Sequence, residues 1–334
     1  MSSTDFTAVN ARARGLTAHL FTRAELTTLA AHDLGALARA LAHSPRVLAP
    51  VGEGANGVEL EGALRRTARH HLHTLSRWEG AAPVLGVFFA EQDRRSLRAL
   101  LRGALATAPA QERLAGLLPT PSLPERVLAE LARQPTPAAV AAHLFVLGHP
   151  EAARLAPLTT GAQPDLLALE LALATGFSER ARREAARGDE NLRRFVALRI
   201  DVANVQGALL LATARDVEAG TWFVEGGRDF SRADFGSVVG APAPAARLRE
   251  VLARGPLAAL VADPALDAAR LERAAFALAL ARQRRAARLE PLSSAPVLLF
   301  LLRLEGQGRD VRRILWGVAL GAPTALISPE LVTP

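Results

Sequence analysis

Apolar residues recur along most of the chain with the spacing of α-helices. Residues three and four positions apart lie on one face of a helix, and this spacing marks residues 5–43, 59–78, 138–147 and 271–289. In the first segment the apolar stripe is formed by Leu16, Leu20, Leu26, Leu29, Leu34, Leu37 and Leu41. Pro83 is expected to break the chain after the second segment. The pattern therefore predicts a chain built mainly from helices.

One helical pattern occurs three times along the chain. Its copies cover residues 93–102, 201–210 and 307–316. The same apolar position is held by Leu97, Val205 and Val311, which are separated by 108 and 106 residues. A small polar residue precedes it each time, namely Ser96, Asn204 and Asp310. The third copy contains Gly306 and Gly308, each of which costs about 1 kcal/mol inside a helix, so we expect that helix to start late.

A second sequence pattern recurs with nearly the same spacing. It is a helical segment that ends in proline, at Pro45, Pro150 and Pro264, with steps of 105 and 114 residues. Two markers with one period predict three tandem units of about 107 residues, which is longer than the usual solenoid repeats of about 20 to 50 residues. We expect three small helical bundles, at residues 1–112, 113–225 and 226–334, laid side by side as one compact unit.

Composition strengthens the helical prediction and removes several kinds of chemistry. Leu, Ala and Arg, which are strong helix formers, are the most abundant of the 334 residues, whereas aromatic residues are scarce, which favours an all-α fold. The chain has no Cys, so disulfides, thiolate metal sites and cysteine nucleophiles are excluded. It also has no Lys, so Arg supplies every one of the 40 basic residues.

The net charge of +7 raises the question of nucleic-acid binding. The arginines are spread along helical segments beside Glu and Asp, a pattern typical of solvated helix faces. Single-stranded nucleic acids also require aromatic residues for base stacking, and only 4% of the residues are aromatic. We therefore expect no nucleic-acid partner.

Candidate chemical motifs have simpler interpretations. Gly52-Glu-Gly-Ala-Asn-Gly57 matches a dinucleotide fingerprint, but a helix and two prolines precede it instead of a strand, so we interpret it as a turn. His70 and His73 share a helix face that offers no further ligand, so we expect no metal site. Asp93 and Asp201 occupy equivalent repeat positions, which favours helix caps or surface residues over paired catalytic acids.

No catalytic constellation emerges from the sequence, and we expect neither an enzyme site nor a cofactor. The apolar runs near residues 208–212 and 296–302 are far shorter than the roughly 20 residues that span a bilayer. The first residues lack the basic and apolar regions of a signal peptide. These features predict a protein that is soluble or peripheral to a membrane.

Several short words along the chain resemble one known family. They are Asp5-Phe6, Asn10-Ala-Arg-Ala-Arg14, residues 93–102, Gly148-His149-Pro150, residues 198–210, residues 222–230 and residues 311–321. Their order, the chain length and the triplication resemble the C subunit of bacterial and archaeal V/A-type rotary ATPases. The eukaryotic counterpart is the d subunit of the V-ATPase membrane sector. The resemblance covers nearly the whole chain.

The resemblance implies a fold and a role. Three helical bundles would form a funnel with pseudo-threefold symmetry, whose mouth receives the central shaft subunits of the D and F type. Its narrow end would sit on the proteolipid ring, at the cytoplasmic face of the membrane. One copy per complex would couple ATP chemistry to proton or sodium transport as a non-catalytic central-stalk subunit.

A socket for a charged shaft needs charged walls. The candidate contact residues are Arg94, Arg95, Arg98, Arg102, Arg312 and Arg313. The alternative interpretation is a helical-repeat scaffold that binds other proteins without association with an ATPase. The sequence leaves open the direction of ATP chemistry and the choice of ion.

Overall fold

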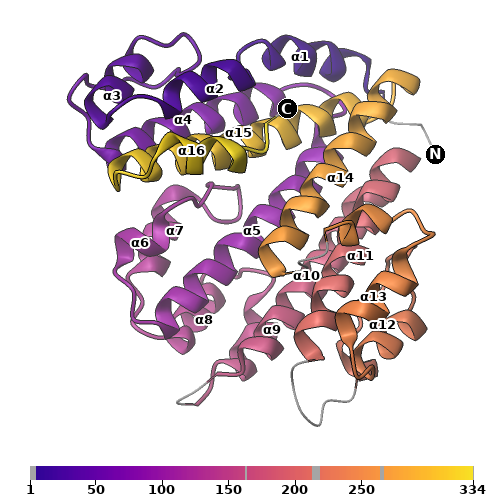
Figure 1. Ribbon diagram of the computed structural model, residues 1–334. Helices are drawn as coiled ribbons and strands as arrows, with labels where there is room; N and C mark the ends of the chain where they lie inside the picture. The colour runs from indigo at the N-terminus through magenta and orange to yellow at the C-terminus, as the bar shows by residue number, and fades with distance from the viewer. Residues whose placement is uncertain (1–4, 162–163, 213–218, 264–266, 334) are drawn as a thin grey trace. The chain divides into compact units, whose positions relative to one another are not determined.

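The structure is a computed structural model that describes residues 5–161, 164–212, 219–263 and 267–333. Within these residues every regular element is a helix, which confirms the all-α prediction (Figure 1). The first half contains α1 (Thr7–Thr17), α2 (Arg23–Ala30), α3 (Leu34–Ala42), α4 (Gly57–Ser76), α5 (Ala81–Leu105), α6 (Ala110–Leu114), α7 (Glu125–Ala132), α8 (Pro137–Val146) and α9 (Ala152–Leu155). The second half contains α10 (Leu166–Ala186), α11 (Glu190–Leu211), α12 (Arg232–Val239), α13 (Pro244–Leu252), α14 (Ala268–Leu289), α15 (Ala295–Ala319) and α16 (Thr324–Ile327).

The order of helix lengths recurs along the chain. Short helices precede a pair of long helices three times: α2 and α3 before α4 and α5, α7 to α9 before α10 and α11, and α12 and α13 before α14 and α15. Each helix with the repeated pattern, α5, α11 or α15, is the second long helix of its set. The three tandem units, with boundaries at residues 112 and 225, stay a prediction. The Pro264 end of the second marker lies outside the described residues.

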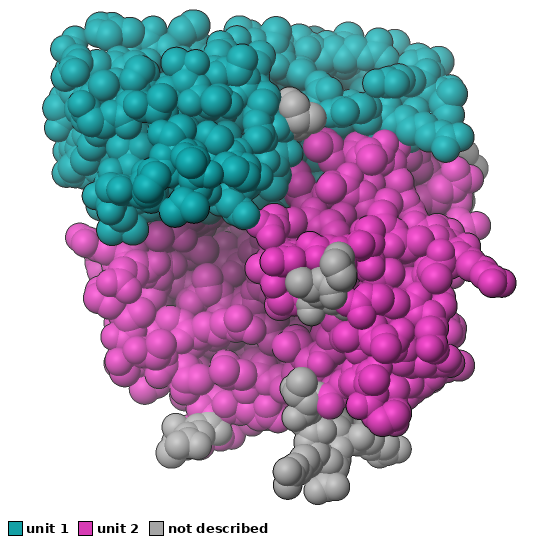
Figure 2. All heavy atoms as spheres, in the orientation of Figure 1, with its two compact units in different colours: residues 1–85, 283–334 teal, residues 86–282 magenta. Residues whose placement is uncertain are grey.

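The chain divides into two compact units (Figure 2). Unit 1 joins residues 1–85 to residues 283–334, and unit 2 comprises residues 86–282. In unit 1, α15 packs against α1, α2, α3 and α4. The core there includes the fully buried Leu26, Leu37, Leu60, Ile314 and Leu315. Burying each such side chain contributes roughly 1.5–3 kcal/mol, so α15 is the helix around which unit 1 is assembled.

Unit 2 is built around two groups of helices. One core cluster joins leucines of α5, α7, α8 and α10, among them Leu97, Leu100, Leu131, Leu144 and Leu173. Helix α10 also packs along α11, and α11 carries α12 and α13 on another side. The two helices with the repeated pattern in this unit, α5 and α11, therefore each have a buried face in the core.

The segment 5–43 is not one helix, which corrects the sequence prediction. It forms α1, α2 and α3 because two polar residues start new helices inside it. Thr22 and Glu25 form a capping box at the start of α2, with the Thr22 side chain accepting from the Glu25 N–H. The Asp33 side chain accepts from the Ala36 N–H at the start of α3. Apolar spacing alone does not register these breaks.

Pro83 does not break the chain, contrary to expectation. It lies in the first turn of α5, where proline removes no helical hydrogen bond. The break falls earlier, at Gly80, whose φ of 82° is in the left-handed region. A side chain there would also collide with the Asp5 carbonyl oxygen, so this turn requires glycine.

One expectation about the C-terminal part is also wrong. Helix α15 runs without interruption through Gly306 and Gly308 and does not start late. The burial of its apolar face outweighs the intrinsic cost of two glycines. Residues 323–333 contain α16 and a 3-10 turn at Ser328–Glu330.

Candidate functional site

Asp201 is a buried carboxylate in the middle of α11. Its side chain is fully enclosed and accepts the backbone N–H groups of Arg228, Asp229 and Phe230 at 2.9–3.2 Å. Burial raises the pKa of Asp201, and the three N–H groups offset only part of that effect. A carboxylate that collects three consecutive amides holds their loop in one position against the helix.

Asn204 extends this anchor by one helical turn. Its side-chain amide donates to the Val224 carbonyl at 2.8 Å, and its side-chain oxygen accepts the Val224 N–H at 2.9 Å. Gly227 lies so close to Asp201 that a Cβ atom would overlap the carboxylate. Two polar side chains of α11 thus fasten residues 224–230 along their length. Phe223 is half-buried, and its ring centre lies 5.7 Å from that of Phe235.

Helix α15 holds distant segments in the same way, through Gln307 and Asp310, which occupy the positions of Asp201 and Asn204 in the repeated pattern. Asp310 is fully buried and accepts the N–H groups of Val332 and Thr333 at 2.7 Å. One turn earlier, the Gln307 side-chain oxygen accepts the Phe21 N–H at 2.7 Å. These three bonds lie within unit 1. The C-terminal segment and the start of α2 are therefore both held by polar side chains of one helix.

Helix α5 anchors its loop through Asp93. This carboxylate is fully buried and accepts the hydroxyl groups of Thr120 and Ser122 at 2.5 Å. Arg180 of α10 donates to the same carboxylate at 2.7 Å. A charge-assisted bond of this kind contributes roughly 1.5–3 kcal/mol. Asp93 therefore ties the loop at residues 120–122 and helix α10 to α5.

The Gly148-His149-Pro150 word lies beside this anchor. The His149 side chain is 2% exposed, and its Nε2 lies 4.0 Å from an Asp93 oxygen. Its Nδ1 accepts the Glu151 N–H at 3.2 Å. Burial lowers the pKa of His149 to about 4 despite the opposing charge of Asp93. His149 is thus a neutral, enclosed ring at neutral pH.

These contacts overturn the expectation that Asp93 and Asp201 are caps or surface residues. Both are interior positions of long helices, and each holds a segment 27 to 29 residues further along the chain. We call Asp93, Asp201, Asn204, Gln307 and Asp310 the loop anchors. A signal is present in the sequence, because Asp93 and Asp201 precede Leu97 and Val205 by one helical turn on a buried face.

A second buried ionic cluster surrounds Glu91. Its carboxylate pairs with Arg94 at 2.8 Å, Arg95 at 2.9 Å and Arg199 at 2.6 Å. Burial alone would raise the pKa of Glu91, but the three guanidinium groups outweigh it and hold that pKa well below its usual range. The cluster joins α5 to α11, which are both helices of the repeated pattern.

The candidate contact arginines all have partners or near neighbours within the chain. Arg94 and Arg95 bind Glu91, as described above. Arg98 and Arg102 both approach Glu170, with nitrogen–oxygen distances of 3.9 and 2.7 Å. Arg312 pairs with Glu61 at 3.2 Å, and Arg313 donates to the Glu330 carbonyl. Their contact with another protein stays a prediction.

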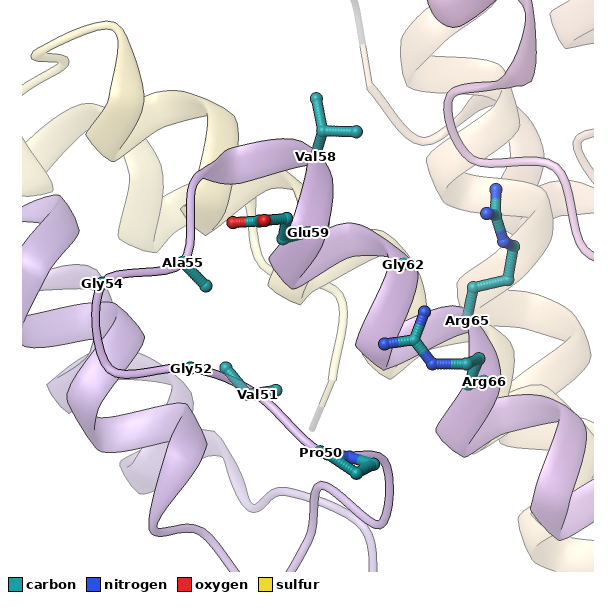
Figure 3. Close-up of a pocket in the computed structure, with 10 residues that line it drawn as sticks. All are labelled: Pro50, Val51, Gly52, Gly54, Ala55, Val58, Glu59, Gly62, Arg65 and Arg66. Carbon is teal, nitrogen blue, oxygen red and sulfur yellow. The ribbon is translucent and has the colours of Figure 1, made fainter.

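The glycine-rich loop lines a pocket of about 570 Å³. Figure 3 shows this loop facing the first turns of α4. The Asn56 side chain accepts the N–H groups of Val58 and Glu59, and the Glu59 carboxylate accepts the Asn56 N–H. The amides that would hold a phosphate are thus already bonded, and Glu59 adds negative charge. The interpretation as a turn agrees with this geometry.

The histidines of α4 behave differently from one another. His70 and His73 are exposed, whereas His71 is 1% exposed and packs edge-on against Phe300. Burial lowers the pKa of His71 to about 4. Over the described ranges, no group of three or more His, Asp or Glu side chains is arranged to hold a metal ion.

No helix in the described part of the chain has the length and apolar character needed to cross a membrane.

The sequence model of the family described as ATP synthase (C/AC39) subunit matches residues 9–329. Two relatives from two strains of Thermus thermophilus, each named as the C subunit of a V-type ATP synthase, are 29% identical to the chain over 255 residues. That alignment covers 76% of this chain and 76% of each relative.

Because the family match spans nearly the whole chain, the protein belongs to the ATP synthase (C/AC39) subunit family. The resemblance inferred from short ordered words is thereby confirmed, and so is the association with V-type ATPases.

Proposed function

We propose that this protein is a non-catalytic central-stalk subunit of a V/A-type ATPase that couples a rotating shaft to the membrane proteolipid ring. Three bundles would form a funnel whose mouth receives shaft subunits of the D and F type, with one copy per complex. The subunit would lie peripherally at the cytoplasmic face of the membrane. It would transmit torque between ATP chemistry and the transport of protons or sodium ions.

The observation that carries this proposal is the set of loop anchors on α5, α11 and α15. A subunit that transmits torque has to resist twisting, because flexible loops would deform and less of the rotation would reach the partner. Each helix of the repeated pattern holds a distant segment through buried polar groups, including the carboxylates of Asp93, Asp201 and Asp310. Directional bonds to buried charge fix relative positions more tightly than apolar contact alone. Such fastening supports a mechanical role.

Exposed apolar residues support contact with other proteins. Phe145, Val146 and Leu147 follow one another at the end of α8, with 67%, 82% and 44% of their surfaces exposed. Consecutive large apolar residues in water are uncommon on a free protein and mark surfaces of association. Arg98 and Arg102 of α5, with 32% and 54% of their side chains exposed, offer a different, charged surface. Two surfaces of contrasting chemistry suit a subunit that joins two unlike partners.

The proposal is tested by purifying the tagged full-length protein from detergent-solubilised membranes and identifying the proteins that accompany it. We expect the shaft and proteolipid subunits of a V-type ATPase in stoichiometric amounts. Asp201→Ala serves as the matched variant, because loss of a loop anchor should reduce recovery of the complex. A protein recovered as a clean monomer would contradict the proposal and favour the scaffold alternative.

A further inference from the structure

One face of α5 carries more positive charge than its neighbours neutralise. Arg94, Arg98 and Arg102 follow one another at four-residue spacing and therefore share a helix face. Arg199 of α11 adds a fourth guanidinium near the first of them, at the Glu91 carboxylate. All of these residues belong to unit 2.

The nearby carboxylates are already taken by other arginines. Glu91 is shared among Arg94, Arg95 and Arg199 at 2.6–2.9 Å. Glu170 of α10 binds Arg102 at 2.7 Å. Arg94 has a second favourable contact, because its guanidinium lies 5.7 Å from the centre of the Phe177 ring. The residues at both ends of this face are therefore satisfied.

Arg98 is the exception. Its nearest carboxylate oxygen, on Glu170, lies 3.9 Å away, beyond hydrogen-bond distance. The positive charge of Arg94 lies one turn away on the same face. Burial and the charge of Arg94 lower the pKa of Arg98, and Glu170, Glu91 and Glu272 do not restore it. Because an arginine does not lose its proton in a protein, Arg98 remains a cation whose ion pair with Glu170 is long, at 3.9 Å, and is shared with Arg102.

The Arg98 side chain is also accessible, with 32% of its surface exposed. An exposed planar guanidinium is suited to binding a carboxylate, which accepts two parallel N–H bonds from it. A single carboxylate carries one negative charge, which matches the one arginine of this face whose acid partner lies beyond hydrogen-bond distance.

We propose that Arg98 binds an acidic side chain of a partner protein and is the principal charged docking residue of this face. This inference rests on the proposed function, because it assigns the residue through which a shaft subunit would be gripped. It also separates Arg98 from Arg94, Arg95 and Arg102, whose charges are engaged within the chain.

The test uses the full-length Arg98→Gln variant and ATPase complexes that have been stripped of this chain. We expect the variant to rebind about tenfold more weakly than the unaltered protein, with a smaller loss of binding at high salt. Its melting temperature should not fall, since the substitution removes a poorly compensated cation. The matched control is Arg126→Gln, which also removes one charge; Arg126 is 88% exposed and pairs with Glu130. The control should rebind normally.

Three results would overturn the inference. One is Arg98→Gln rebinding as tightly as the unaltered protein. Another is a clear drop in its melting temperature with binding restored on cooling, which would make Arg98 a structural residue. The third is an Arg98→Gln variant that rebinds the complex normally but no longer binds vesicles containing phosphatidylserine, with phosphatidylcholine vesicles as the reference. That result would assign the site to lipid headgroups. If the unaltered protein does not rebind at all, the proposed function fails first.

Discussion

The Asp201→Asn substitution tests the loop anchor most sharply, because it preserves shape while removing charge and one acceptor. In the native structure one Asp201 oxygen accepts from Arg228 and Phe230, and the other accepts from Arg228 and Asp229. An asparagine places an NH₂ group where one oxygen was. At least one backbone N–H then faces another donor instead of an acceptor.

The magnitude follows from these contacts. Leaving a buried donor unsatisfied costs about 1–3 kcal/mol, and the remaining bonds weaken because the acceptor is no longer charged. We expect Asp201→Asn to reduce the free energy of unfolding of unit 2 by about 2–3 kcal/mol. Asp201→Ala should cost about 4 kcal/mol, since it removes all three acceptor contacts although water can reach part of the loop.

Denaturant unfolding followed by circular dichroism measures the free energy, and hydrogen exchange localises the effect. The amides of Arg228, Asp229 and Phe230 should exchange much faster in Asp201→Asn than in the unaltered protein. Glu179→Gln is the matched control, because Glu179 forms an exposed ion pair with Arg154 worth less than about 1 kcal/mol. If Asp201→Asn unfolds within about 0.5 kcal/mol of the unaltered protein, with unchanged exchange, the anchor argument is refuted.

Three other predictions concern the same packing and electrostatics. Gly227→Ala should destabilise unit 2 by about 1–3 kcal/mol in denaturant unfolding, because its Cβ would displace the Asp201 carboxylate; a neutral effect would contradict the close approach. Glu91→Gln should cost about 3–5 kcal/mol in the same assay, because Arg199 and its neighbours lose their buried counter-ion; a gain in stability would count against the cluster. His71 has a folded pKa of about 4 against 6.5 in the unfolded chain, so it withholds a proton on folding and stability falls as the pH drops from 6.5 to 4. His71→Leu should therefore lose about 2 kcal/mol less than the unaltered protein between about pH 7 and about pH 5, and an unchanged pH slope would rule out this assignment.

Much of the helical content follows from apolar spacing alone. The long helix predicted at residues 271–289 is α14, and the segment 59–78 is α4 within two residues at each end. Spacing does not reveal the breaks at Thr22 and Asp33, because both depend on a side chain that captures a local N–H group. It also does not reveal that α15 continues through Gly306, because the compensating burial comes from helices distant in sequence.

The loop anchors are harder to predict than the helices. The repeated pattern places Asp93 and Asp201 at equivalent positions, but their partners lie 27 to 29 residues away in loops without a recognisable pattern. Only the folded chain brings those loops against the helix. A polar residue one turn before Leu97 or Val205, in an otherwise apolar stripe, indicates burial, and a buried carboxylate requires donors.

We propose that the protein transmits rotation between the central shaft and the proteolipid ring and has no catalytic activity of its own. The direct measurement compares ATP hydrolysis and ion pumping in membranes whose V-type ATPase lacks this chain, before and after the purified full-length protein is added back. We predict that hydrolysis continues without the chain, that pumping does not, and that add-back restores the ratio of pumping to hydrolysis. Ion pumping that is equally efficient with and without the chain would contradict the account.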